Sequence, residues 1–172
     1  MYDDFIIHLE SLKSGEHSFK FLLDKTFFES IEYSIITTGK VEVNLNLLKK
    51  ERLCELLFDF NGFINLDCDR CADAFSFPVS FKNETILKYG SEAFIDEGIW
   101  TVENSTKELD VKHFLYETLS LAISSKVTHE DADENCDPVV IEKLNSYSKA
   151  YSDDNNESES TDPRWDALNK LK

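Results

Sequence analysis

The chain has 172 residues, and its 34 acidic side chains outnumber its 18 basic ones, which gives a formal net charge of −16. This length suits one domain with a core of its own, and the sequence shows neither an apolar run long enough to cross a membrane nor a signal-peptide pattern at its start. Such acidity disfavours direct, tight RNA binding, because affinity for phosphate comes mainly from Lys and Arg. The four cysteines show no disulfide-rich pattern, which favours a reducing compartment, so we expect a cytoplasmic protein.

The first half of the chain carries short runs in which apolar residues alternate with polar ones. This period of two indicates strands with one buried face and one wet face. Residues 26–30 are compatible with either a helical turn or a loop. The runs that predict strands are 5–9, 17–23, 31–37, 41–47, 53–60 and 75–89. We expect them to pair as neighbouring hairpins in a mainly antiparallel sheet.

A tight turn is predicted at Asn61-Gly62, which stands between aromatic and aliphatic runs. Both residues tolerate positive φ, as the two-residue turns of β-hairpins require. With Phe60 opposite Phe63, such a hairpin would place Cys54 opposite Asp69. The hairpin prediction therefore brings Cys54 close to the two cysteines that follow Asp67.

Two helices are predicted in the second half of the chain. Asp110 is a good N-cap for a helix from Val111 to about Ile123, and its apolar stripe, widened by Leu121, would cover the sheet. Asp137-Pro138 predicts the start of a shorter helix that ends near Tyr147, because aspartate caps a helix and proline fits its first position.

The end of the chain changes character after residue 147. Residues 148–161 are rich in Ser, Asp, Asn and Glu and predict a flexible acidic linker. Residues 162–172 repeat the Asp-Pro start signal and predict a short docking helix. Its apolar face consists of Trp165, Leu168 and Leu171. So short a helix is marginal alone, so that it requires a surface, either on its own domain or in the groove of a partner.

Together these elements predict an α+β protein. It consists of a mainly antiparallel β-sheet with a covering helix, a short second helix and an acidic C-terminal tether that ends in a short helix. The folded domain is expected over residues 1–147, with an irregular acidic segment at 90–108 anchored by Trp100.

Five stretches of the chain form a recognisable set: Leu66–Cys71, Phe77–Val79, Tyr116–Leu121, Asp162–Leu168 and the early stretch from Ile6 to Phe28. With these motifs the chain resembles the YceD family (DUF177 domain). The family is associated with accumulation of large-subunit ribosomal RNA. The resemblance therefore implies a role in ribosome assembly, which composition alone does not show.

Cys68 and Cys71 have the spacing of a metal knuckle, because two intervening residues let both sulfurs face one ion. A tetrahedral zinc needs two further ligands. Cys136 and His129 are candidates for a Cys₃His site, and Cys54 is a weaker candidate for the fourth ligand. The alternative is that these cysteines are packed thiols. A thioredoxin-like redox role is disfavoured, because a strand follows the pair and the acidic neighbours are expected to raise the thiol pKa.

Arg70 is the one positive charge within the Cys-x-x-Cys segment. Its simplest role is an ion pair with Asp67, Asp69 or Asp73, and the alternative is an anchor for a phosphate or for a carboxylate of a partner. The sequence contains no Gly-rich phosphate loop, no nucleophile elbow and no paired metalloprotease histidines. We therefore expect a protein that is not an enzyme.

The function that we infer is that of a non-catalytic accessory factor in large-subunit biogenesis. Its charge favours a basic ribosomal protein or the pre-ribosomal large subunit as partner, because opposite charges attract and steer. Candidate partner-binding residues are Arg70, Arg164, Trp165, Leu168 and Leu171. Two alternatives stay open: the acidity serves only solubility, or the chain is a small zinc-binding interaction module unrelated to ribosomes.

Overall fold

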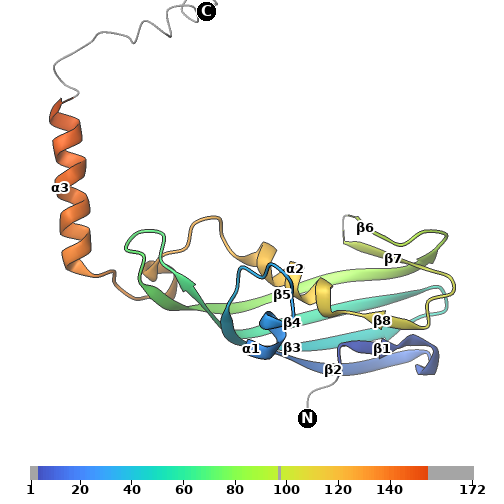
Figure 1. Cartoon of the computed structure of the whole chain (residues 1–172). Coiled ribbons are helices and arrows are strands. Elements are labelled where there is room, and N and C mark those ends of the chain that lie inside the picture. Colours follow the sequence, from blue (N-terminus) through green and yellow to red (C-terminus); the bar gives the residue numbers. More distant parts are fainter. Residues whose placement is uncertain (1–3, 97, 155–172) are drawn as a thin grey trace, which may run out of the picture. The chain divides into compact units, whose positions relative to one another are not determined.

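The computed structural model describes residues 4–96 and 98–154, and its chain divides into two units, one ending at Glu134 and one beginning at Asn135. Most strands of the first unit form a long, curved sheet (Figure 1). The strands are β1 (Ile6–His8), β2 (Gly15–Leu23), β3 (Thr38–Lys49), β4 (Leu53–Asp67), β5 (Ala74–Gly90), β6 (Phe94–Asp96), β7 (Ile99–Glu103) and β8 (Glu108–Asp110). The helices are η1 (Leu9–Ser11), α1 (Lys25–Glu29), α2 (Lys112–Ala122), η2 (His129–Ala132) and α3 (Pro138–Asp154).

The main sheet has the strand order β2-β3-β4-β5-β7-β6, and β1 pairs with β8 in a separate two-stranded sheet. Neighbouring strands from β2 to β5 are antiparallel, whereas β7 pairs with β5 in parallel. The α+β class and the mainly antiparallel sheet predicted from the sequence are thus confirmed. The parallel strand β7 and the short β6 replace the irregular structure expected over residues 90–108.

The hairpin turn predicted at Asn61-Gly62 is wrong. Both residues lie inside β4, where Asn61 pairs with Glu42 on one side and with Ser80 on the other. A glycine is required here for a different reason: Gly62 has a φ of 154°, and a Cβ at this position would lie 2.1 Å from the carbonyl oxygen of Lys40. Close approach of two strand backbones, rather than a turn, therefore explains this glycine.

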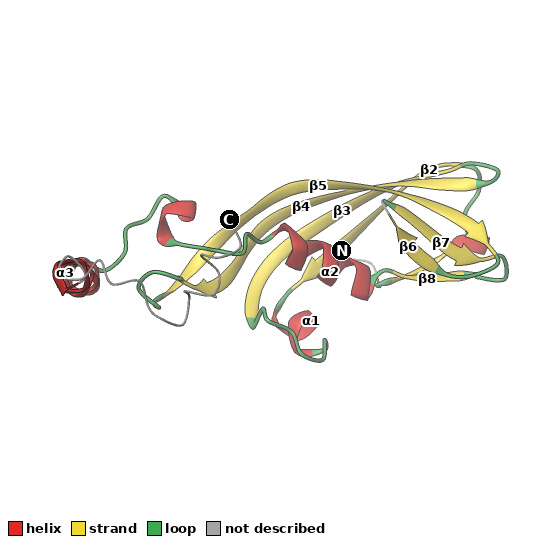
Figure 2. Cartoon of the chain, turned by 90° about the horizontal axis from the view of Figure 1, so that it is seen from above, coloured by secondary structure: helices red, strands yellow, loops and turns green. Residues whose placement is uncertain are grey.

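The helices α1 and α2 of the first unit cover one face of the sheet. Figure 2 shows α1 and α2 on the same side of the curved sheet. The ring of Phe114 in α2 lies 5.2 Å from that of Phe58 and stacks on that of Trp100 at 4.8 Å, so that α2 and Trp100 cover the core as expected. Leu121 does not widen this contact, because its side chain is 86% exposed.

The strand predicted over residues 31–37 is absent from the described structure. This segment follows α1 as a chain of turns, with Ile31 and Ile36 buried and Tyr33 in the left-handed region at a φ of 62°. The hydroxyl group of Tyr116 in α2 accepts a hydrogen bond from the backbone N–H of Ile35. The apolar β-branched residues of this segment therefore pack in the core although the segment is a loop. Their composition alone does not distinguish such a loop from a strand.

The predicted helix starts are close to the observed ones. The Asp110 carboxylate accepts a hydrogen bond from the backbone N–H of Lys112, although Val111 takes the N-cap position of α2. In the second unit, the Asp137 carboxylate accepts from the N–H of Val139 at the start of α3. α3 continues to Asp154, through the first half of the stretch predicted as a linker. The predicted helix over 162–172 lies outside the described residues.

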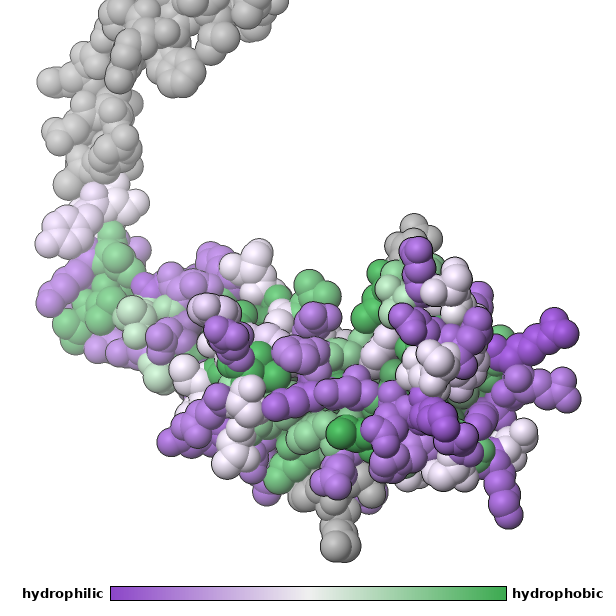
Figure 3. All heavy atoms as spheres, turned by 45° about the vertical axis from the view of Figure 1, so that its right-hand side comes forward, coloured by the Kyte–Doolittle hydropathy of each residue, from purple (hydrophilic) through white to green (hydrophobic). Residues whose placement is uncertain are grey.

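Hydrophilic side chains cover much of the face seen in Figure 3. Apolar residues gather in the core between the sheet and α2. None of the helices in the described ranges is long and apolar enough to cross a membrane.

Candidate metal centre

The turn between β4 and β5 holds Cys68 and Cys71 in a compact, hydrogen-bonded loop. The backbone N–H of Cys68 donates to the carbonyl oxygen of Asp73, and that of Ala72 donates to the carbonyl oxygen of Cys68, each at 2.9 Å. The N–H of Arg70 points at the Cys68 Sγ, at 3.4 Å. Ala72 takes a left-handed φ of 63°, which reverses the chain directly after the second cysteine. This geometry turns both sulfurs to one side of the loop.

A second segment, distant in sequence, is joined to this loop by the Asp69–Val127 clamp, a pair of hydrogen bonds. The N–H of Asp69 donates to the carbonyl oxygen of Val127 at 2.8 Å, and the N–H of Val127 donates to the Asp69 carboxylate at 2.6 Å. Directly after Val127 the chain enters η2, where Thr128 and Asp131 form a capping box. The clamp and the capping box together fix the position of His129.

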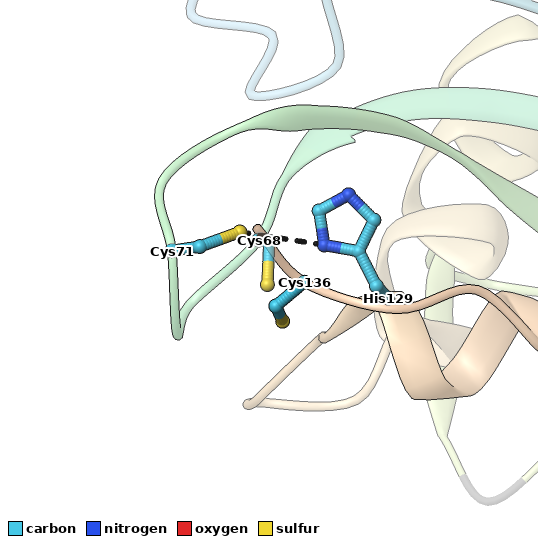
Figure 4. Close-up of side chains that lie close together, drawn as sticks. All are labelled: Cys68, Cys71, His129 and Cys136. Carbon is cyan, nitrogen blue, oxygen red and sulfur yellow. Dashed lines mark hydrogen bonds between the residues drawn. The ribbon is translucent and has the colours of Figure 1, made fainter. Parts of the chain in front are cut away.

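The imidazole of His129 points into the loop. Its Nδ1 lies 3.4 Å from the Cys71 Sγ (Figure 4). Its ring also packs against that of Phe75, with 4.8 Å between centroids. Cys68 is 2% exposed, and Cys71 and His129 are each 8% exposed. The three groups are therefore enclosed rather than solvated.

The Cys136 Sγ completes the Cys₃His cluster, which we define as Cys68, Cys71, His129 and Cys136. One ligand atom from each residue lies within 4.8 Å of the corresponding atoms of the other three (Figure 4). A Zn–S bond of about 2.3 Å in a tetrahedral site corresponds to sulfur atoms about 3.8 Å apart, so that a contraction of about 1 Å suffices to coordinate one ion. The donor set and its spacing fit zinc.

The thiol of Cys68 has a depressed pKa. Burial raises this pKa, but hydrogen bonds from the backbone of Cys71 and Arg70 and an interaction with His129 outweigh burial and lower it from 9.0 to about 6. A lowered pKa favours the thiolate, which is the form that binds metal. The expectation that acidic neighbours raise the thiol pKa at this position is thus wrong for Cys68, because nearby N–H groups dominate.

Cys54 is not part of the cluster. It lies in β4, paired with Lys49 on one side and Leu87 on the other, and it is fully buried in the core. Its predicted position opposite Asp69 depended on the hairpin at Asn61-Gly62, which the structure does not form. Burial raises the pKa of the Cys54 thiol, as expected of a packed cysteine.

Arg70 forms an ion pair with Glu130 of η2, a partner that the sequence did not suggest. Asp69 instead takes part in the clamp to Val127. The clamp could not be foreseen from the sequence, whereas the Thr128–Asp131 spacing of a capping box is a local signal for the start of η2. The other predicted partner-binding residues, Arg164, Trp165, Leu168 and Leu171, lie outside the described residues.

Fold and site together define an α+β protein with a Cys₃His cluster beside the β4–β5 turn of an antiparallel sheet. The chain belongs to the YceD family: a model of that family, described as large ribosomal RNA subunit accumulation protein YceD, matches residues 56–172. The match includes the whole cluster and extends to the last residue. Searches of curated proteins and of solved structures each found no match. The family description connects the chain with accumulation of large-subunit ribosomal RNA.

Proposed function

We propose that this protein is a non-catalytic accessory factor in production of the large ribosomal subunit, and that it binds a basic ribosomal protein or a pre-ribosomal particle in the cytoplasm. The observation that carries the proposal is the family match over residues 56–172. The net charge of −16 favours a protein partner, because a polyanion repels RNA and attracts basic proteins. Because the chain matches the YceD family, the alternative of a zinc-binding module unrelated to ribosomes has less support.

The test is to isolate the full-length chain from cells together with its bound partners, at about physiological salt, where weak surface electrostatics is screened. We expect one or more basic large-subunit proteins, or precursor particles that contain them. Recovery of naked RNA without any ribosomal protein would reject the partner that we propose. Recovery of neither would reject the function itself.

We further propose that the Cys₃His cluster holds a zinc ion. Three observations support this: the chemistry of the donors, the mutual distances within 4.8 Å, and the lowered pKa of Cys68. Four protein ligands leave no open position, so that the ion would be structural and would not activate water. Zinc would join the β4–β5 turn to η2, and would thereby add to the clamp, the Arg70–Glu130 pair and the packing of His129 against Phe75.

Metal analysis of protein purified without chelator tests the zinc proposal. We expect a zinc-to-protein ratio near one, lost in Cys71→Ser and kept in Cys54→Ser, because Cys54 lies in the core away from the cluster. A ratio near zero in the wild-type protein would remove zinc and leave the ribosomal proposal standing. Cys136→Ser separates a four-ligand site from a three-ligand one, because only the former loses affinity.

The remaining partner-binding residues stay part of the proposal. Arg70 is 40% exposed while paired with Glu130, so that its guanidinium can also meet a partner carboxylate. The C-terminal residues Trp165 and Leu168, with Arg164 and Leu171, would enter an apolar groove of the partner. A chain that ends at residue 161 should keep its fold and lose partner recovery; unchanged recovery would remove the C-terminal segment from the proposal.

A further inference from the structure

The face of the main sheet opposite α1 and α2 carries a hollow of 660 Å³ over β2, β3, β4 and β5. Figure 2 shows α1 and α2 on one side of the sheet. The hollow lies on the other side, because its outward-pointing residues alternate along each strand with buried ones that face the core. We call this hollow the sheet cradle and define it by six outward side chains. They are Glu16, Leu48, Glu55, Leu57, Glu84 and Ile86.

Strand register arranges the sheet cradle in two adjacent rows. In the first row, Glu16 pairs with Leu48, Leu48 with Glu55, and Glu55 with Ile86. In the second row, Leu57 stands beside Glu84. Acidic and apolar side chains therefore alternate across the strands. Leu48 and Leu57 are half-buried and Ile86 is 38% exposed, so that they form an apolar floor between the carboxylates.

The charge of the sheet cradle is unbalanced. Neither Lys nor Arg is among the described residues that line it. Glu55 is paired with Lys50, whereas Glu16 and Glu84 are exposed and form no ion pair within residues 4–96 and 98–154. The next row along the sheet carries Lys20 and Lys82 beside Asp59, so the charge there is mixed, unlike that of the cradle.

We propose that the sheet cradle binds a basic segment of a protein partner, with Lys or Arg side chains spaced along an extended chain. The hydrocarbon stem of such a side chain packs on an apolar floor while its charged head reaches a carboxylate at the edge. The alternation of Leu or Ile with Glu offers both contacts within one row. This inference rests on the proposed function and assigns a site to the basic partner.

The test measures binding of a fluorescent peptide of alternating arginine and valine to the full chain by anisotropy, at about 0.15 M salt, where distant charges are screened. The double variant Glu16→Lys/Glu84→Lys removes the acidic edge. A matched control, Glu92→Lys/Glu117→Lys, makes the same change in net charge at exposed positions outside the cradle. A third variant, Leu57→Gln, removes part of the apolar floor.

We expect the edge variant to weaken peptide binding about tenfold or more, and the control less than about twofold, since a reversed charge acts mainly on groups in contact with it. Leu57→Gln should also weaken binding while the net charge is unchanged. Three results would each overturn the proposal that the cradle binds a basic segment. They are an equal loss of peptide affinity in the edge and control variants, no peptide binding by the wild-type chain, and a preference of the wild-type chain for single-stranded RNA over the peptide.

Co-sedimentation with large-subunit precursors distinguishes the two levels of the argument. If the wild-type chain and the edge variant co-sediment equally, the binding role proposed for the cradle is wrong and the proposed function stands. If the wild-type chain does not co-sediment, the proposed function is wrong whatever the peptide does. Loss of co-sedimentation in the edge variant alone supports both.

Discussion

Asp69 and Val127 exchange two hydrogen bonds across 58 residues of sequence, one through backbone groups and one through the Asp69 carboxylate. This clamp brings the loop of Cys68 and Cys71 next to the start of η2. His129, two residues beyond Val127, thereby reaches the Cys71 sulfur. The Cys₃His cluster thus depends on an aspartate that is not itself one of its members.

Asp69→Ala should lower the free energy of unfolding by about 1.5 to 3 kcal/mol, because a hydrogen bond to a charged acceptor is lost and the N–H of Val127 is left without its partner. Urea unfolding measures this change. Asp69→Asn, which keeps an acceptor oxygen, should lose less. Asp67→Ala is the control, since Asp67 is exposed and lies outside the clamp; equal losses at Asp67 and Asp69 would contradict the role of the clamp.

Removal of the proposed zinc with a chelator should loosen the two segments that the ion would join. We expect faster amide hydrogen exchange over residues 68–72 and 127–134, because the ligands would no longer be held together. Exchange in β3, which is paired with β2 on one side and β4 on the other, should not change. Unaltered exchange around His129 after complete metal removal would show that the clamp alone orders this region.

Gly62→Ala should destabilise the protein by more than about 2 kcal/mol, because the new Cβ would lie 2.1 Å from the Lys40 carbonyl oxygen and one of the two backbones must move. Gly15→Ala is a matched control: Gly15 also has a positive φ, of 130°, but a Cβ there has nothing within 4 Å. Denaturant unfolding of both variants separates a steric clash from backbone strain. A larger effect at Gly15 would be inconsistent with the close strand approach.

Asp24 caps α1, and hydrogen bonds from the Thr26 hydroxyl and the backbone N–H of Phe27 lower the pKa of its carboxyl below 3.8. A lowered pKa means that the carboxylate contributes stability above the unfolded-state value and that this contribution is lost as the pH falls through the folded-state value. Asp24→Ala should cost about 1 kcal/mol near neutral pH.

The matched variant for this pH dependence is Asp24→Asn, which retains a capping oxygen but does not titrate. Its stability difference from the wild-type protein should be present near pH 7 and should shrink below about pH 4, as the wild-type carboxyl takes up its proton. Thermal unfolding across this range measures the difference. A difference that grows on acidification would have the wrong sign for a lowered pKa.

Local patterns in the sequence were sufficient where the structure depends on neighbouring residues. The alternation around Val43 and Leu45 predicted the strand that became β3, and Asp137-Pro138 predicted the start of α3. The spacing of Cys68 and Cys71 predicted that both sulfurs would face one point, and both belong to the Cys₃His cluster. Each of these signals comes from a single helical turn, one strand face or one short loop, so that residue types within a few positions decide the outcome.

Contacts between distant segments decided the rest. Asn61-Gly62 has the composition of a hairpin turn, yet pairing with β3 and β5 on both sides keeps it inside β4. That pairing places Cys54 in the core. Arg70 pairs with Glu130, 60 residues away, although three aspartates stand closer in sequence. The preference of a dipeptide such as Asn-Gly for a turn contributes about 1 kcal/mol or less. The hydrogen bonds and buried side chains of a strand that is paired on both sides together outweigh this preference.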